Sequence, residues 1–65
     1  MKNELLKILK RARKPMSAPR LSVLVSIRMR ENKKIQHVDS MMRSLVDEGR
    51  VELIDGHLFM YKEEG

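Results

Sequence analysis

The dipeptide Asp55-Gly56, which stands between two short apolar runs, constrains the fold of this chain most. An Asp-Gly pair readily adopts the left-handed backbone of a two-residue β-turn, so the flanking runs predict a β-hairpin. With a two-residue turn, Leu53 pairs with Leu58, and the other pairs follow from that register. The inward-facing residues are then predicted to be Val51, Leu53, Leu58 and Met60, and the outward-facing ones Glu52, Ile54, His57, Phe59 and Tyr61.

The segment before the hairpin carries a clear helical pattern. From about Ile35 to Glu48, apolar residues recur at helical spacing, and Gly49 is a natural residue for ending a helix. The apolar side is formed by Val38, Met41, Met42 and Leu45. This helix therefore leads directly into the hairpin.

The first half of the chain predicts two more elements. Residues 3–13 have the spacing of an amphipathic helix, which Pro15 ends. Ser17 and Pro19 favour the start of a second helix, since serine caps helices and proline is tolerated in the first turn. Residues 21–29 also alternate between apolar and mostly polar positions, so a strand stays open as the alternative there.

Size and composition limit the possible functions. The 65 residues predict one small domain, residues 1–65, with an ordered core of about 3–61 that contains no cysteine for a disulfide. A hydrophobic fraction of 42% is too high for a disordered tail, and no apolar run or signal pattern predicts membrane insertion or export, so we expect a cytoplasmic protein. Neither a catalytic motif nor a metal-ligand spacing is present, so no enzyme activity, cofactor or metal is expected.

Charge is distributed unevenly along the chain. Residues 1–34 contain eleven basic and two acidic side chains, whereas residues 35–65 contain three basic and seven acidic ones. The net charge of +5 favours an anionic partner, and nucleic acid is the first candidate. A weaker alternative is that a helix in residues 2–14 lies on an acidic membrane surface.

Three helices followed by a two-stranded hairpin resemble the winged helix-turn-helix superfamily, an α+β fold. The segment from Val38 to Val51 is similar to a pattern of small bacterial, phage and plasmid regulators, in which apolar residues stand at the places of Val38, Met42, Leu45 and Val51 around Gly49. The first six residues are also loosely similar to short regulators of fimbrial operons. In place of the family's short glycine-bearing turn between helices two and three, this chain has the longer segment 27–34.

The resemblance implies a transcription regulator that places helix three in the major groove of double-stranded DNA. The side of this helix opposite its apolar stripe predicts base contacts by Gln36, His37, Ser40, Arg43 and Ser44. Phosphate contacts are predicted for the basic residues before it, Arg20, Arg28, Arg30, Lys33 and Lys34.

A further surface is predicted on the outward side of the hairpin, where Ile54, Phe59 and Tyr61 are expected to bind a second copy or a protein partner. A homodimer or a cooperative array on DNA is expected, because one small module offers little contact area. Helix three carries Asp39 and Asp47, and this acidity keeps open an alternative function as a protein-interaction module without DNA binding.

Overall fold

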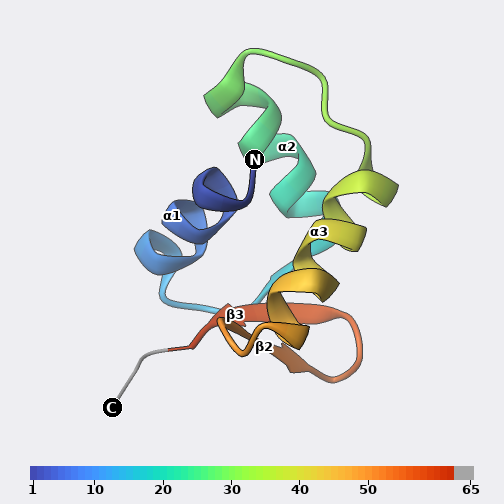
Figure 1. The fold of residues 1–65 in the computed structure, drawn as a ribbon. Helices are drawn as coiled ribbons and strands as arrows, with labels where there is room; N and C mark the ends of the chain where they lie inside the picture. Colours follow the sequence, from blue (N-terminus) through green and yellow to red (C-terminus); the bar gives the residue numbers. More distant parts are fainter. Residues whose placement is uncertain (63–65) are drawn as a thin grey trace.

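The computed structural model describes residues 1–62 and belongs to the α+β class (Figure 1). Its elements, in chain order, are α1 (Lys2–Ala12), β1 (Met16–Ser17), α2 (Ala18–Met29), α3 (Ile35–Asp47), β2 (Val51–Ile54) and β3 (Leu58–Tyr61). The three predicted helices are confirmed within a residue or two, and residues 21–29 lie in a helix rather than a strand. Ser17 stands at the N-cap of α2 in extended conformation and Pro19 in its first turn, as the sequence predicted.

The prediction of a two-stranded sheet was wrong, because the sheet has three antiparallel strands in the order β1-β3-β2. Met16 and Ser17, which precede α2, pair with Phe59 and Leu58 of β3. A strand of two residues is too short to show alternation in sequence. It forms here because β3 offers a free edge, whose backbone groups gain hydrogen-bond partners.

The predicted hairpin register was wrong by one residue on β3. Asp55 and Gly56 have φ values of 54° and 78°, and the N–H of His57 donates to the carbonyl of Ile54 at 3.3 Å. His57 then remains outside the ladder, and Leu58 rather than His57 pairs with Ile54. A shift of one residue turns every later side chain of the strand to the other face of the sheet.

The shift corrects the predicted partner surface. Phe59 is fully buried, with 0% of its surface exposed, and the half-buried Tyr61 shares its face of β3, so neither lies on the outer face of the sheet. Ile54 stays on the outer face as predicted, and the half-buried Leu58 and Met60 join it there.

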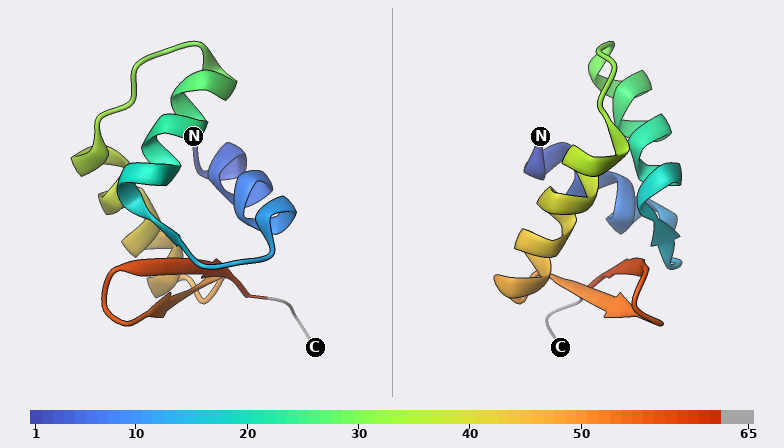
Figure 2. Two further views of the ribbon diagram at one scale, coloured as in Figure 1. Left: turned by 180° about the vertical axis from the view of Figure 1, so that it is seen from behind. Right: turned by 90° about the vertical axis from the view of Figure 1, so that its right-hand side faces the viewer.

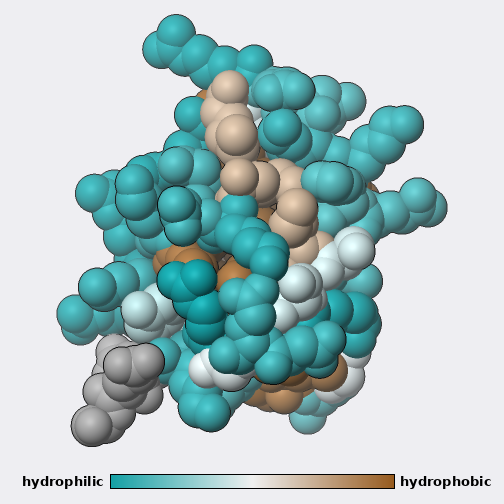
Figure 3. All heavy atoms as spheres, viewed as in Figure 1, coloured by the Kyte–Doolittle hydropathy of each residue, from teal (hydrophilic) through white to brown (hydrophobic). Residues whose placement is uncertain are grey.

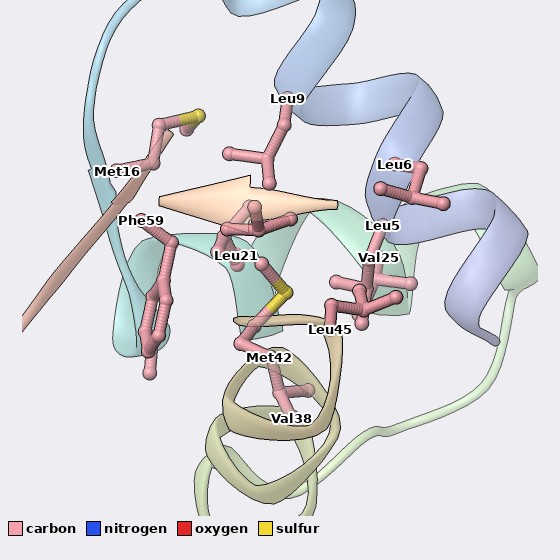
Figure 4. Packing of buried hydrophobic residues seen from close by; sticks show 12 residues of the cluster. Leu5, Leu6, Leu9, Met16, Leu21, Val25, Val38, Met42, Leu45 and Phe59 are labelled. Atoms are coloured by element: carbon pink, nitrogen blue, oxygen red, sulfur yellow. The ribbon is translucent and has the colours of Figure 1, made fainter. Parts of the chain in front are cut away.

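The three helices stand over one face of the sheet and enclose a single core (Figure 2). Figure 4 shows side chains of α3 meeting those of α1, α2 and β3 in this core. Its buried hydrophobic members are Leu5, Leu6, Leu9, Met16, Ala18, Leu21, Val25, Val38, Met42, Leu45, Val51 and Phe59. Val38, Met42 and Leu45 of the apolar stripe of α3 are therefore fully buried and Met41 is half-buried, and the opposite side of the helix faces outward.

Hydrophilic side chains cover most of the face seen in Figure 3, with hydrophobic ones gathered in a central band and over the hairpin. The exposed large hydrophobic residues are Val23, Ile27, Ile35 and Leu53. None of the helices described in residues 1–62 has both the length and the apolar character that crossing a bilayer requires.

Candidate nucleic-acid interface

The outer side of α3 is a continuous polar surface. Val38, Met42 and Leu45 are each fully buried, so the helix has a fixed rotation about its axis. This rotation exposes four of the five residues predicted to contact bases and leaves the fifth half-buried. The exposed ones are Gln36, His37, Ser40 and Arg43, and the half-buried one is Ser44.

Arg43 is held in place by two neighbours. Its Nε lies 3.0 Å from the carboxylate of Asp39, one helical turn earlier, and its guanidinium lies 6.0 Å from the ring centre of Phe59. An exposed pair of this kind contributes only about 0.3–0.5 kcal/mol, so it orients Arg43 without locking it. Because Phe59 is buried, Arg43 covers the core at the junction of α3 and the sheet.

The structure divides the five cations predicted to contact phosphate into two groups. Arg20, Arg30 and Lys34 are exposed and form no ion pair with the residues described here. Arg28 instead donates from Nε to Glu4 of α1 at 2.5 Å, and Lys33 lies 3.2 Å from Glu31. The hydrogen bond from Arg28 holds the pKa of Glu4 below its ordinary value of 4.5. The first group is therefore better placed to bind DNA.

Two serines of α2 hold the segment that enters α3, and the sequence reasoning missed them. The Ser22 hydroxyl donates to the carbonyl of Lys33 at 2.6 Å, and the N–H of Lys33 donates to Ser26 Oγ at 2.9 Å. Ser22 is buried, with 6% of its surface exposed. The two serines lie four residues apart among apolar neighbours, a spacing that puts them on one helix face and was the available signal. Together they fix Lys34 at the start of α3.

The hairpin turn lies beside the first half of α3 and adds His57 to the candidate surface. His57, Gln36 and Asp39 line an open pocket of about 460 Å³, together with Ser17, Ala18, Pro19 and Ile35. The ring Nδ1 of His57 lies 2.9 Å from the carbonyl oxygen of Asp55, which can only accept a hydrogen bond. In the neutral ring, Nδ1 therefore carries the proton and Nε2 is the acceptor. Sequence reasoning had assigned His57 only to the strand.

The candidate surface contains hydrogen-bonding groups and cations but no metal site. Among residues 1–62, no three His, Asp or Glu side chains are grouped closely enough to hold a metal ion. The exposed groups that α3 presents are amide, hydroxyl and guanidinium groups in a row on one helix.

Comparison with known proteins gives no match for this chain among protein-family models, curated proteins or solved structures.

Proposed function

We propose that this protein is a small DNA-binding transcription regulator that inserts α3 into the major groove of double-stranded DNA. The single observation that carries the proposal is the outer side of α3. This side presents the exposed residues Gln36, Ser40 and Arg43 in one row, and Lys34, which forms no ion pair within residues 1–62, stands at its N-terminal end. A protruding helix of this width fits the major groove, where base edges differ between all four base pairs.

The arrangement of the elements supports a winged helix-turn-helix assignment. α2 is followed by α3 after the connecting residues 30–34, which are longer than the family's usual turn, and Gly49, with φ of 77°, lies between the end of α3 at Asp47 and the hairpin. The hairpin turn lies beside α3 through His57 and Gln36, so a groove occupied by α3 brings the turn close to the adjoining backbone.

Each polar residue of α3 suits a particular contact. The guanidinium of Arg43 matches guanine O6 and N7, and the amide of Gln36 matches adenine N6 and N7. Ser40 lies between them and pairs with several base edges, while His37 and Ser44 flank the row. Arg20, Arg30 and Lys34 provide the phosphate contacts that position the helix.

The charge of α3 makes this binding dependent on the flanking cations. Asp39 and Asp47 lie on the helix with Arg43, so α3 alone does not attract phosphate. Counterion release must come from Arg20, Arg30 and Lys34, and three contacts give a slope of about −2.7 for log affinity against log salt. Binding should accordingly be measurable at low salt and weaken steeply as salt rises.

The test begins with selection of the best site from random-sequence duplexes, followed by fluorescence anisotropy over a salt series. We expect R43A to lose about 1–3 kcal/mol on the selected site and little on unrelated duplexes. K34A should weaken binding to all duplexes alike and reduce the salt slope by about 1. N3A, an exposed change on α1, is the control and should bind normally. If R43A and K34A both bind like the unmodified protein, α3 is not the DNA-binding element.

We expect a dimer or a cooperative array on DNA, because a chain of 65 residues offers little contact area. A single module buries only about 600–1,000 Å² of protein surface on DNA, so higher affinity requires more than one copy. Sedimentation of the protein with duplexes carrying one or two selected sites measures the number of copies bound.

A protein-interaction module is the second candidate function. The half-buried Ile54, Leu58 and Met60 share the outer face of the sheet, and such an apolar strip favours contact with another protein. Substitution of Leu58 by glutamine on that face distinguishes the two functions. If the protein is a DNA-binding regulator, this variant keeps its affinity for a single DNA site. If the protein is an interaction module, the variant loses partner binding.

A further inference from the structure

We propose that the end of α1 forms a second, separate DNA-binding surface, so that one molecule bridges two duplexes. This inference rests on the proposed function of α3, since bridging requires both surfaces. The surface consists of the exposed residues Lys10, Arg11, Arg13 and Lys14 and is called the α1 cationic surface below.

Within residues 1–62, the cations of the α1 cationic surface form no ion pair. Five ion pairs are formed within residues 1–62, and they engage Lys2, Arg28, Lys33, Arg43 and Arg50. None of the four cations at the end of α1 takes part in them. The C-terminal end of a helix carries a partial charge of only about −0.5, so its dipole compensates a small part of four positive charges. An anion bound there would relieve their mutual repulsion.

A groove adjoins these cations and gives the surface a defined shape. Lys10 and Arg13 line it from α1, and Met60 and Tyr61 from β3, around a volume of about 430 Å³. The ammonium of Lys10 lies 5.9 Å from the ring centre of Tyr61, which fixes the position of this cation. Among the described residues, Glu52 is the carboxylate that lines the groove, against the two cations Lys10 and Arg13. The phenol of Tyr61 adds a hydrogen-bond donor suited to a phosphate oxygen.

The chemistry of this surface favours DNA over a membrane or a protein. Leu5, Leu6 and Leu9, the apolar side of α1, are buried in the core and leave no apolar face to insert into lipid. Protein interfaces are depleted of lysine, whereas Lys10 and Lys14 are two of the four residues of this surface.

The two surfaces point in different directions. In Figures 1 and 2, α1 and α3 lie on opposite sides of the molecule, and the outer side of α3 faces away from α1. The groove at Tyr61 and the pocket at His57 lie at opposite ends of the hairpin strands. A straight duplex that contacts α3 therefore does not reach the α1 cationic surface, and a second duplex is needed to occupy it.

The experiment is a bridging assay with the full-length protein at about 50 mM salt, where phosphate contacts are strong. A duplex with the selected site is fixed to beads, and retention of a second, fluorescent duplex is measured. K10Q/R13Q should reduce retention about tenfold and leave the single-duplex dissociation constant within about twofold. The matched control R30Q/K34Q also removes two positive charges, but from the residues before α3. It should weaken single-duplex binding instead. Circular dichroism of both variants verifies that they fold.

Three other results would contradict the bridging model or the proposed function. If K10Q/R13Q bridges like the unmodified protein, bridging comes from α3 surfaces of a dimer, and the second surface does not exist. If K10Q/R13Q weakens single-duplex binding as much as R30Q/K34Q does, all these cations belong to one interface. If the unmodified protein binds no single duplex by anisotropy, the proposed function itself fails before bridging is examined.

Discussion

At the residue scale, the contact that most directly controls the candidate interface is that of Ser22 with Lys33. The Ser22 hydroxyl and Ser26 Oγ bind the carbonyl and the N–H of the same residue, so the segment entering α3 is held from both sides. Without them, the backbone groups of Lys33 would need water as a partner. The position of Lys34 and Gln36 at the start of α3 therefore depends on two side chains of α2.

We expect S22A to lower the free energy of unfolding by about 1–3 kcal/mol, because the partly buried carbonyl of Lys33 loses its donor. Urea denaturation measures the loss, and S40A on the exposed side of α3 is the control, with an expected change within about 0.5 kcal/mol. Equal stability of S22A and the unmodified protein would show that water replaces the hydroxyl at no cost.

Sequence reasoning identified the face of α3 but not the partners of its residues. Helical periodicity alone determines that Gln36, Ser40 and Arg43 share the side opposite Val38. The pairing of Arg28 with Glu4 joins two helices, so no local pattern indicates it. The position of Arg43 over Phe59 depends on the strand register, which the sequence reasoning had placed one residue off.

At the scale of elements, the helices were predictable and the sheet was only partly so. Each helix has a buried apolar side at helical spacing, together with a proline or glycine near its ends. The hairpin was predictable from Asp55-Gly56, but its register depends on whether His57 enters the ladder, a choice decided by packing. Burial of the Phe59 ring among the helices is the gain that selects the observed register.

Substitutions at Gly49 test whether the connection between α3 and β2 requires a left-handed backbone conformation. The φ of Gly49 is 77°, and a Cβ added there would meet nothing within 4 Å, so a substitution is strained by backbone conformation alone. We expect G49A to cost about 1–2 kcal/mol of unfolding free energy by urea denaturation. G49N should recover part of this loss, because asparagine tolerates the left-handed region better. If alanine and asparagine are equally destabilising, the cost has another origin than backbone conformation.

At the scale of the whole molecule, two ion pairs connect the basic N-terminal helix to the rest of the fold. Glu4 binds Arg28 of α2, and Glu48, just after α3, binds Lys2, each at 2.5 Å. The hydrogen bond from Lys2 is the main cause that holds the pKa of Glu48 below its ordinary value of 4.5, as Arg28 does for Glu4. Glu4 is one of the two acidic residues among residues 1–34, and Glu48 comes from the acidic second half of the chain.

The lowered pKa values determine the sign of the acid response. The folded state holds both glutamates ionised more strongly than the unfolded state does, so their contribution is fully present above pH 4.5. As the pH falls through the lowered folded values, both states become protonated and the contribution is lost. We therefore expect the urea midpoint to decrease on acidification below pH 4.5, and to decrease less in 0.5 M salt, which screens exposed pairs.

The double variant E4Q/E48Q separates these two pairs from the other carboxylates. It should unfold at a lower urea concentration at pH 7 and lose less stability on acidification than the unmodified protein, because its two contributions are already absent. N3Q, next to Glu4 and exposed, keeps both pairs and should retain the full acid response. A midpoint for E4Q/E48Q that falls with pH as steeply as that of the unmodified protein would assign the acid response to other carboxylates. Packing of buried side chains such as Leu5 and Leu9, rather than these ion pairs, would then hold α1 against its neighbours.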